Sequence, residues 1–205
     1  MSLVYENKVP NSYRNAFVKK VREVSNRLGI DPNWLMAIMY TESARTFSPS
    51  IQNSIGATGL IQFMPKTAIG LGTTTTALKN MSAVDQLDYV EKYLNTYKNK
   101  LKSYVDTYFA IFFPLAIGKP DEWVIQGAGL SSSLIAKQNP LFNTNKDGKI
   151  QVWEVKKVML EKLPREWVND GSFTLAIKSY KGYLTAGLLL IAIGGLYIFK
   201  NVRKK

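Results

Sequence analysis

The residue with the clearest capacity for chemistry is Glu42, near the end of the segment WLMAIMYTESA. If this segment is helical, Glu42 follows Ile38 by four residues and Met39 by three, at the edge of an apolar stripe. Partial burial there penalises the charged carboxylate and raises its pKa, as a general acid working near neutral pH requires. The alternative is an ordinary glutamate at a helix end, paired with Arg45.

Composition limits what other chemistry is available. The 205 residues include no cysteine and no histidine, which excludes disulfides, Cys/His zinc sites, thiol nucleophiles and Ser-His-Asp triads. The reactive groups are therefore carboxylates, hydroxyls, amides, lysines or oxygen-bound metals. The formal net charge of +12 suggests a polyanionic partner such as a cell-wall polymer, a nucleic acid or an anionic membrane. No nucleic-acid-binding motif accompanies the charge, and we expect no nucleic-acid partner.

A second segment, IGATGLIQFMP at 55–65, contributes glycines and an amide. Gly56 and Gly59 permit close approach of the backbone to a ligand, and Gln62 offers both a donor and an acceptor to sugar substituents. The alternative for the glycines is simple turn formation. Leu60 is expected to pack in the core.

Together these two segments resemble the lytic transglycosylase domain of the soluble (SLT) type, which has a lysozyme-like fold. A Glu-Ser pair is followed by Gly-x-x-Gly-Leu-x-Gln and then Met-Pro, with about 17 residues from Glu42 to Gly59. The resemblance covers roughly residues 15–120. It implies peptidoglycan as the partner, a catalytic Glu42 with no required cofactor, and substrate contacts from Ser43, Gly59, Leu60 and Gln62.

The third motif of this family, usually Tyr-Asn-Ala-Gly after a buried helix, is altered in this chain. Phe113-Pro114 stands where Tyr-Asn is expected, and Gly118 replaces the glycine. Tyr108 would supply the missing hydroxyl to the substrate from one turn earlier; the alternative is a buried structural tyrosine.

The number of carboxylates separates the possible reactions. Ordinary glycosidases use two, yet the sequence has no second acidic residue between Glu42 and Val84. A single glutamate suits the reaction that the resemblance implies, cleavage of the β-1,4 bond between N-acetylmuramic acid (MurNAc) and N-acetylglucosamine (GlcNAc) with a 1,6-anhydro-muramic product. The alternatives are a hydrolytic muramidase (lysozyme) and a non-enzymatic protein that binds peptidoglycan or serves as a structural membrane protein.

A separate motif at 143–154 matches the twelve-residue EF-hand loop. Calcium would be held by side chains and by the backbone carbonyl of Lys149, the side chains being those of Asn143, Asn145, Asp147 and Glu154. Asn143 stands where Asp is usual, so only two carboxylates remain and binding should be weak. The alternative is a metal-free turn.

The helix that must position Glu42 has recognisable boundaries. Gly29 stops the preceding helical pattern, Asp31 can cap the next helix, and Pro32 suits its first turn. Leu35 and Ile38 belong to its apolar stripe. Glu42 should therefore lie at the end of a buried helix.

The segment from Tyr183 to Phe199, YLTAGLLLIAIGGLYIF, carries no charge. As a helix it would reach about 26 Å, close to the hydrocarbon thickness of a bilayer. The cations after it, from Lys200 on, fit a cytoplasmic or inner-leaflet end. The alternative is a buried core helix. The first twenty residues lack the apolar region of a signal peptide, so delivery in a virus particle with an internal membrane is a hypothesis.

The expected fold class is all-α (mainly α), a lysozyme-like helical domain plus a C-terminal transmembrane helix. We expect a lytic transglycosylase domain at 1–125, an EF-hand-like extension at 126–165, an interfacial linker at 166–182, the membrane helix at 183–199 and a basic tail at 200–205. This organisation places a single-pass protein in a bacterial envelope or in the internal membrane of a phage virion. It sets no oligomeric state.

Overall fold

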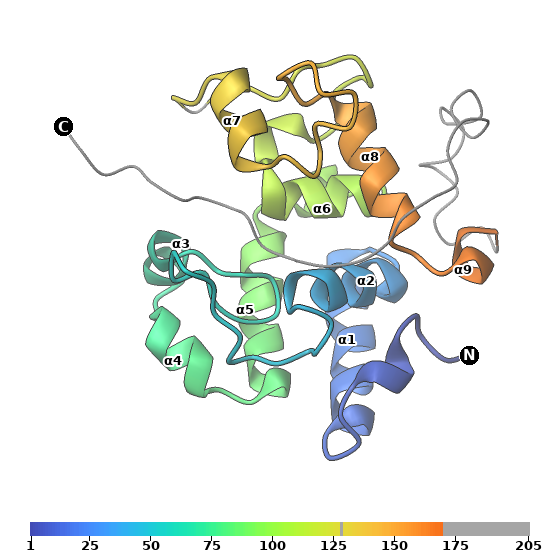
Figure 1. The fold of residues 1–205 in the computed structure, drawn as a ribbon. Coiled ribbons are helices and arrows are strands. Elements are labelled where there is room, and N and C mark those ends of the chain that lie inside the picture. The colour runs from blue at the N-terminus through green and yellow to red at the C-terminus, as the bar shows by residue number, and fades with distance from the viewer. Residues whose placement is uncertain (128, 170–205) are drawn as a thin grey trace.

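The computed structural model describes residues 1–127 and 129–169, and helices make up the architecture of this part (Figure 1). The α-helices are α1 (Arg14–Leu28), α2 (Pro32–Glu42), α3 (Pro65–Gly70), α4 (Thr75–Asn80), α5 (Ala83–Asn95), α6 (Tyr104–Phe112), α7 (Ser132–Gln138), α8 (Val152–Glu161) and α9 (Arg165–Asn169). Three 3-10 turns accompany them: η1 (Glu6–Lys8), η2 (Lys98–Lys100) and η3 (Pro114–Ala116). Within the described ranges only isolated β-bridges occur, so the predicted mainly helical class is confirmed there.

Helix α2 begins and is positioned as its sequence predicts. The Asp31 side chain accepts a hydrogen bond from the Asn33 N–H at 2.8 Å, and Pro32 occupies the first turn. Gly29 ends α1 in the left-handed conformation, with φ of 71°. Residues 35–39 are all buried, and α2 packs against α1 and α6. Glu42 is the last residue of this buried helix.

The Gln86 side chain ties the loop after α2 to helix α5. Gln86, fully buried on α5, accepts a hydrogen bond from the Leu60 N–H at 2.6 Å and donates to the carbonyls of Pro49 and Leu78. Gly59 has a φ of +83°, and a Cβ there would lie 2.2 Å from Gln86 Oε1. Only glycine therefore lets the loop approach α5 this closely.

The extension after α6 packs on the same hydrophobic core as the N-terminal helices. The Phe142 ring lies 4.9 Å from that of Phe112 and 6.2 Å from that of Tyr108, both on α6. Figure 1 shows α7 and the start of α8 on the far side of α6 from α2. At the end of α8, the Tyr5 hydroxyl donates a 2.6 Å hydrogen bond to the Lys162 carbonyl, which ties the start of the chain to this extension.

None of the helices in residues 1–127 and 129–169 is long and apolar enough to cross a membrane. The predicted membrane segment, 183–199, and the basic tail, 200–205, lie outside the described residues.

Candidate active site

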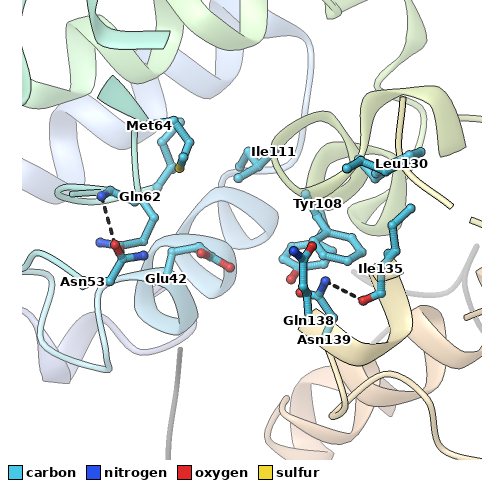
Figure 2. Close-up of a pocket in the computed structure, with 14 residues that line it drawn as sticks. Glu42, Asn53, Gln62, Met64, Tyr108, Ile111, Leu130, Ile135, Gln138 and Asn139 are labelled. Carbon is cyan, nitrogen blue, oxygen red and sulfur yellow. Dashed lines mark hydrogen bonds between the residues drawn. The ribbon is translucent and has the colours of Figure 1, made fainter. Parts of the chain in front are cut away.

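A pocket lies between the end of α2 and the helices α6 and α7 (Figure 2). One wall combines Glu42 with the loop between α2 and α3, and the other is made by α6, α7 and the residues next to them. The residues that line it are Glu42, Asn53, Ala57, Ile61, Gln62, Met64, Tyr108, Ile111, Phe112, Phe113, Leu130, Ile135, Gln138 and Asn139. Most of them are apolar or uncharged, so an ionised group inside is poorly solvated.

Glu42 is the one acidic side chain among these lining residues. It is partly buried, and its carboxylate is turned toward the opposite wall (Figure 2). Burial raises the pKa of Glu42 from 4.5 to about 7, against the opposing effect of the Lys162 ammonium. At neutral pH this group therefore exchanges readily between a proton donor and a proton acceptor.

The alternative of an ion pair between Glu42 and Arg45 is not realised among the described residues. The chain turns sharply after α2, and both Ala44 and Arg45 have positive φ. Ser43 is fully buried at this turn, where its Oγ accepts a hydrogen bond from the Phe47 N–H at 2.8 Å. Ser43 thus fixes the backbone beside Glu42 and lies outside the pocket lining.

The predicted loop residues divide into one that lines the pocket and two that lie behind it. Gln62 lines the pocket and donates from Nε2 to the carbonyls of Gly59, at 3.1 Å, and Ile51, at 3.4 Å. Because both partners are acceptors, the orientation of the amide is fixed. Its Oε1 is buried and finds no hydrogen-bond partner within the described residues. Leu60 is fully buried in the core, as predicted, and Gly59 makes room for Gln86.

Tyr108 is buried and lines the wall opposite Glu42. Its ring stacks on Phe112 at 5.7 Å. Burial, reinforced by the charge of Glu42, raises the pKa of Tyr108 well above its usual range, so the hydroxyl stays protonated and can donate. Phe113, at the altered third motif, also lines the pocket, whereas Pro114 begins η3.

The sequence did not point to two residues that line the pocket, Gln138 and Asn139, or to Lys162, which lies outside the lining. Gln138 and Asn139 come from the end of α7, in the segment that was assigned only to the EF-hand-like extension. Lys162, beyond α8, acts on Glu42 through its charge, and burial lowers the pKa of its ammonium. No periodicity or spacing links these residues to Glu42. The amide-rich run KQNP was the one available signal for Gln138 and Asn139, and Lys162 had none.

The structure does not support the predicted calcium site at 143–154. The buried Glu154 carboxylate accepts four hydrogen bonds, from Thr144 N–H and Oγ1, Asn145 N–H and Gln151 N–H. Asn145 and Asp147 likewise accept from loop N–H groups, two residues on in each case. In the described part of the chain no group of three or more His, Cys, Asp or Glu side chains could hold a metal ion.

Three predicted ligands, Asn145, Asp147 and Glu154, thus accept hydrogen bonds from the loop itself. The fourth side chain, Asn143, has a buried Oδ1 with no hydrogen-bond partner among the described residues. Lys149, expected to offer its carbonyl, donates its N–H to Asp147 Oδ1 at 2.8 Å. Gln151 and Glu154 form a reciprocal capping box at the start of α8. The Asn, Asp and Glu pattern therefore fits a self-capped turn.

Residues 19–114 match the family model described as Transglycosylase SLT domain. This family comprises lytic transglycosylases, enzymes that act on the glycosidic bonds of peptidoglycan, and residues 19–114 are similar to an enzyme domain of this type. The matched range includes Glu42, Gln62 and Tyr108 and ends before α7. Comparisons with curated proteins and with solved structures found no match.

Proposed function

We propose that this pocket cleaves the β-1,4 bond between MurNAc and GlcNAc and releases a 1,6-anhydro-muramic product. The observation that carries the proposal is the single carboxylate. Glu42 is the one acidic group among the residues that line the pocket in the described part of the chain. A double-displacement or inverting hydrolase would need a second carboxylate across the scissile bond.

In the proposed reaction Glu42 acts twice. Protonated, it donates its proton to the glycosidic oxygen as the bond to the muramic C1 breaks, while the 2-acetamido group of the sugar stabilises the cationic centre. The resulting carboxylate then takes the proton of the muramic C6 hydroxyl as that oxygen bonds to C1. Glu42 regains the proton that it gave, so protons balance over the reaction and no water is consumed. A pKa of about 7 supports both steps at neutral pH.

The apolar side of the pocket favours attack on C1 by the C6 hydroxyl of the same sugar over attack by water. Ile111, Phe112, Phe113, Leu130 and Ile135 line it. Such a wall leaves few sites for an ordered water and strengthens electrostatic interactions inside. The C6 hydroxyl of the substrate is then the nucleophile closest at hand.

The test is mass spectrometry of the muropeptides that the full-length chain releases from purified peptidoglycan. Wild type should release anhydro-muramic products, and Glu42→Gln should release none while keeping its circular dichroism spectrum. Glu23→Gln, an exposed glutamate on α1, is the matched control and should match wild type. Reducing-end products would contradict the proposal in favour of a muramidase. Binding without release by wild type would favour a non-enzymatic peptidoglycan-binding protein.

We also propose that the segment from Tyr183 to Phe199 tethers this activity to a membrane, of a bacterial envelope or inside a virus particle. The support is its uncharged sequence followed by cations. In flotation with anionic vesicles the full-length chain should rise with the lipid, and Leu190→Arg should reduce the floated fraction severalfold. Equal flotation of the two proteins would refute the tether.

A further inference from the structure

One wall of the pocket comes from outside the matched SLT range. Leu130, Ile135, Gln138 and Asn139 all line the cavity and all follow residue 114. Figure 2 shows Gln138 and Asn139 beside Tyr108, across the cavity from the Glu42 carboxylate. The extension therefore completes a site whose other half holds the acid.

The backbone that carries Gln138 is held firmly. Ile135, one turn earlier, is buried, and its carbonyl accepts hydrogen bonds from the Asn139 N–H and from Asn139 Nδ2, both at 2.9 Å. The Asn139 carbonyl accepts from the Phe142 N–H at 3.0 Å. At the other end, Ser131 Oγ caps α7 through the Leu134 N–H. Gln138 thus projects from a fixed element, as a recognition residue must.

The side-chain amide oxygen of Gln138 lacks a hydrogen-bond donor. Its Oε1 is buried and has no hydrogen-bond partner in the described residues. A buried carbonyl oxygen without a donor costs free energy, roughly what one lost hydrogen bond costs. Such an oxygen in a ligand-sized pocket is satisfied when a ligand supplies an N–H or O–H.

The residues around Gln138 indicate which ligand group would donate the hydrogen bond to its Oε1. Ile135 and Leu130 lie on the same wall and offer apolar surface, and the Tyr108 hydroxyl offers a donor. An acetamido group carries an N–H, a carbonyl and a methyl, and so matches an acceptor, a donor and an apolar surface at once. A plain hydroxyl would use the acceptor and leave the apolar wall uncovered.

We propose that Gln138 is a substrate-binding residue that accepts a hydrogen bond from the acetamido N–H of an N-acetylated sugar. The inference rests on the proposed function and deepens it, because it assigns recognition of the N-acetyl group to the extension. Gln138 touches the substrate and takes no part in proton transfer.

The experiment measures the binding of two neutral oligosaccharides by calorimetry to the full-length chain carrying Glu42→Gln, so that neither is cleaved. One ligand is the β-1,4 tetramer of GlcNAc, and the other is cellotetraose, which has a hydroxyl in place of each acetamido group. Gln138→Met keeps the length of the side chain and removes its hydrogen bonding. Gln126→Met, an exposed glutamine in the same extension, is the matched control. Gln138→Glu retains an oxygen acceptor.

Gln138→Met should raise the Kd for the GlcNAc tetramer about tenfold and leave the Kd for cellotetraose within twofold. Gln126→Met should change neither, and Gln138→Glu should recover most of the lost affinity. Equal Kd values for Gln138→Met and Gln126→Met would overturn the proposal, as would an equal loss for both ligands. If Gln138→Met does not fold, Gln138→Asn, which withdraws the amide by one methylene, carries the same expectation.

These outcomes are separate from those of the proposed reaction. Binding that depends on Gln138, in a chain whose wild type releases no muropeptide, would refute the reaction and leave the recognition residue standing. Release of anhydro products with binding indifferent to Gln138 would refute this inference alone.

Discussion

Replacement of Glu42 by glutamine should stabilise the fold, and should do so increasingly as the pH rises. Burial raises the pKa of Glu42 from 4.5 to about 7, so the folded chain binds this proton more tightly than the unfolded chain does. The stability contributed by the protonated form is fully present below pH 4.5 and is lost as the pH rises through 7. The glutamine side chain does not titrate, so Glu42→Gln escapes this loss.

The size of the effect follows from the same values. Each pKa unit corresponds to about 1.4 kcal/mol, so the free energy of unfolding of Glu42→Gln, relative to wild type, should grow by about 3 kcal/mol between pH 4 and pH 8. The Lys162 ammonium already opposes the shift in the folded protein. Removing the Lys162 charge should therefore enlarge the pH-dependent difference in the free energy of unfolding between Glu42→Gln and the protein with Glu42.

The measurement is urea denaturation of the full-length chain, followed by far-ultraviolet circular dichroism at pH 4, 6 and 8. Wild type, Glu42→Gln and the exposed control Glu23→Gln are compared. A difference between wild type and Glu42→Gln that stays constant with pH would refute the reasoning. So would the same growth in Glu23→Gln, because the effect would then not come from burial of one carboxylate.

Three further outcomes follow from the structure. Peptidoglycan lysis by wild type should fall as the pH rises above about 7, where Glu42 loses the proton it donates; a rate that is flat to pH 9 would argue against Glu42 as the acid. Gly59→Ala should lower the free energy of unfolding by about 3 to 4 kcal/mol, because the new Cβ would collide with Gln86. Gly29→Ala has a similar φ but nothing within 4 Å of its Cβ, so it should lower that free energy by only about 1 kcal/mol. Equal losses for the two variants in thermal melts would contradict the collision. Glu154→Gln should lower the free energy of unfolding by about 2 to 4 kcal/mol, whether the buffer contains calcium or a chelator, whereas the exposed Glu161→Gln should change it little. A loss that depends on calcium would support a metal site after all.

The local parts of the site were predictable from sequence because short-range physics sets them. Asp31 and Pro32 start α2, and the spacing of its apolar residues puts Glu42 at the edge of the core with a raised pKa, as expected. The signals lie within eleven residues of one another. Capping and helical periodicity act over that range and need no knowledge of the rest of the fold.

The distant parts were not predictable in this way. Gln138 reaches the pocket because Ile135 and Phe142, on either side of it in the sequence, pack in the core that the extension shares with the N-terminal helices. Sequence spacing does not record this tertiary contact. The prediction of calcium binding at 143–154 was wrong for another reason. A glutamate at its twelfth position serves equally as a calcium ligand and as the third residue of a helix with a capping box, and the structure has the second.

The hydrogen bond between the Tyr5 hydroxyl and the Lys162 carbonyl has a consequence for synthesis of the chain on the ribosome. The first helices are made early, but this contact joins residues 157 positions apart, and Lys162 also acts on Glu42. A nascent chain that has emerged only as far as residue 114 lacks both the α7 wall and this cation. The charge environment of Glu42 is therefore complete only once residue 162 has left the exit tunnel, so translation itself delays the assembly of the site for which we propose cleavage.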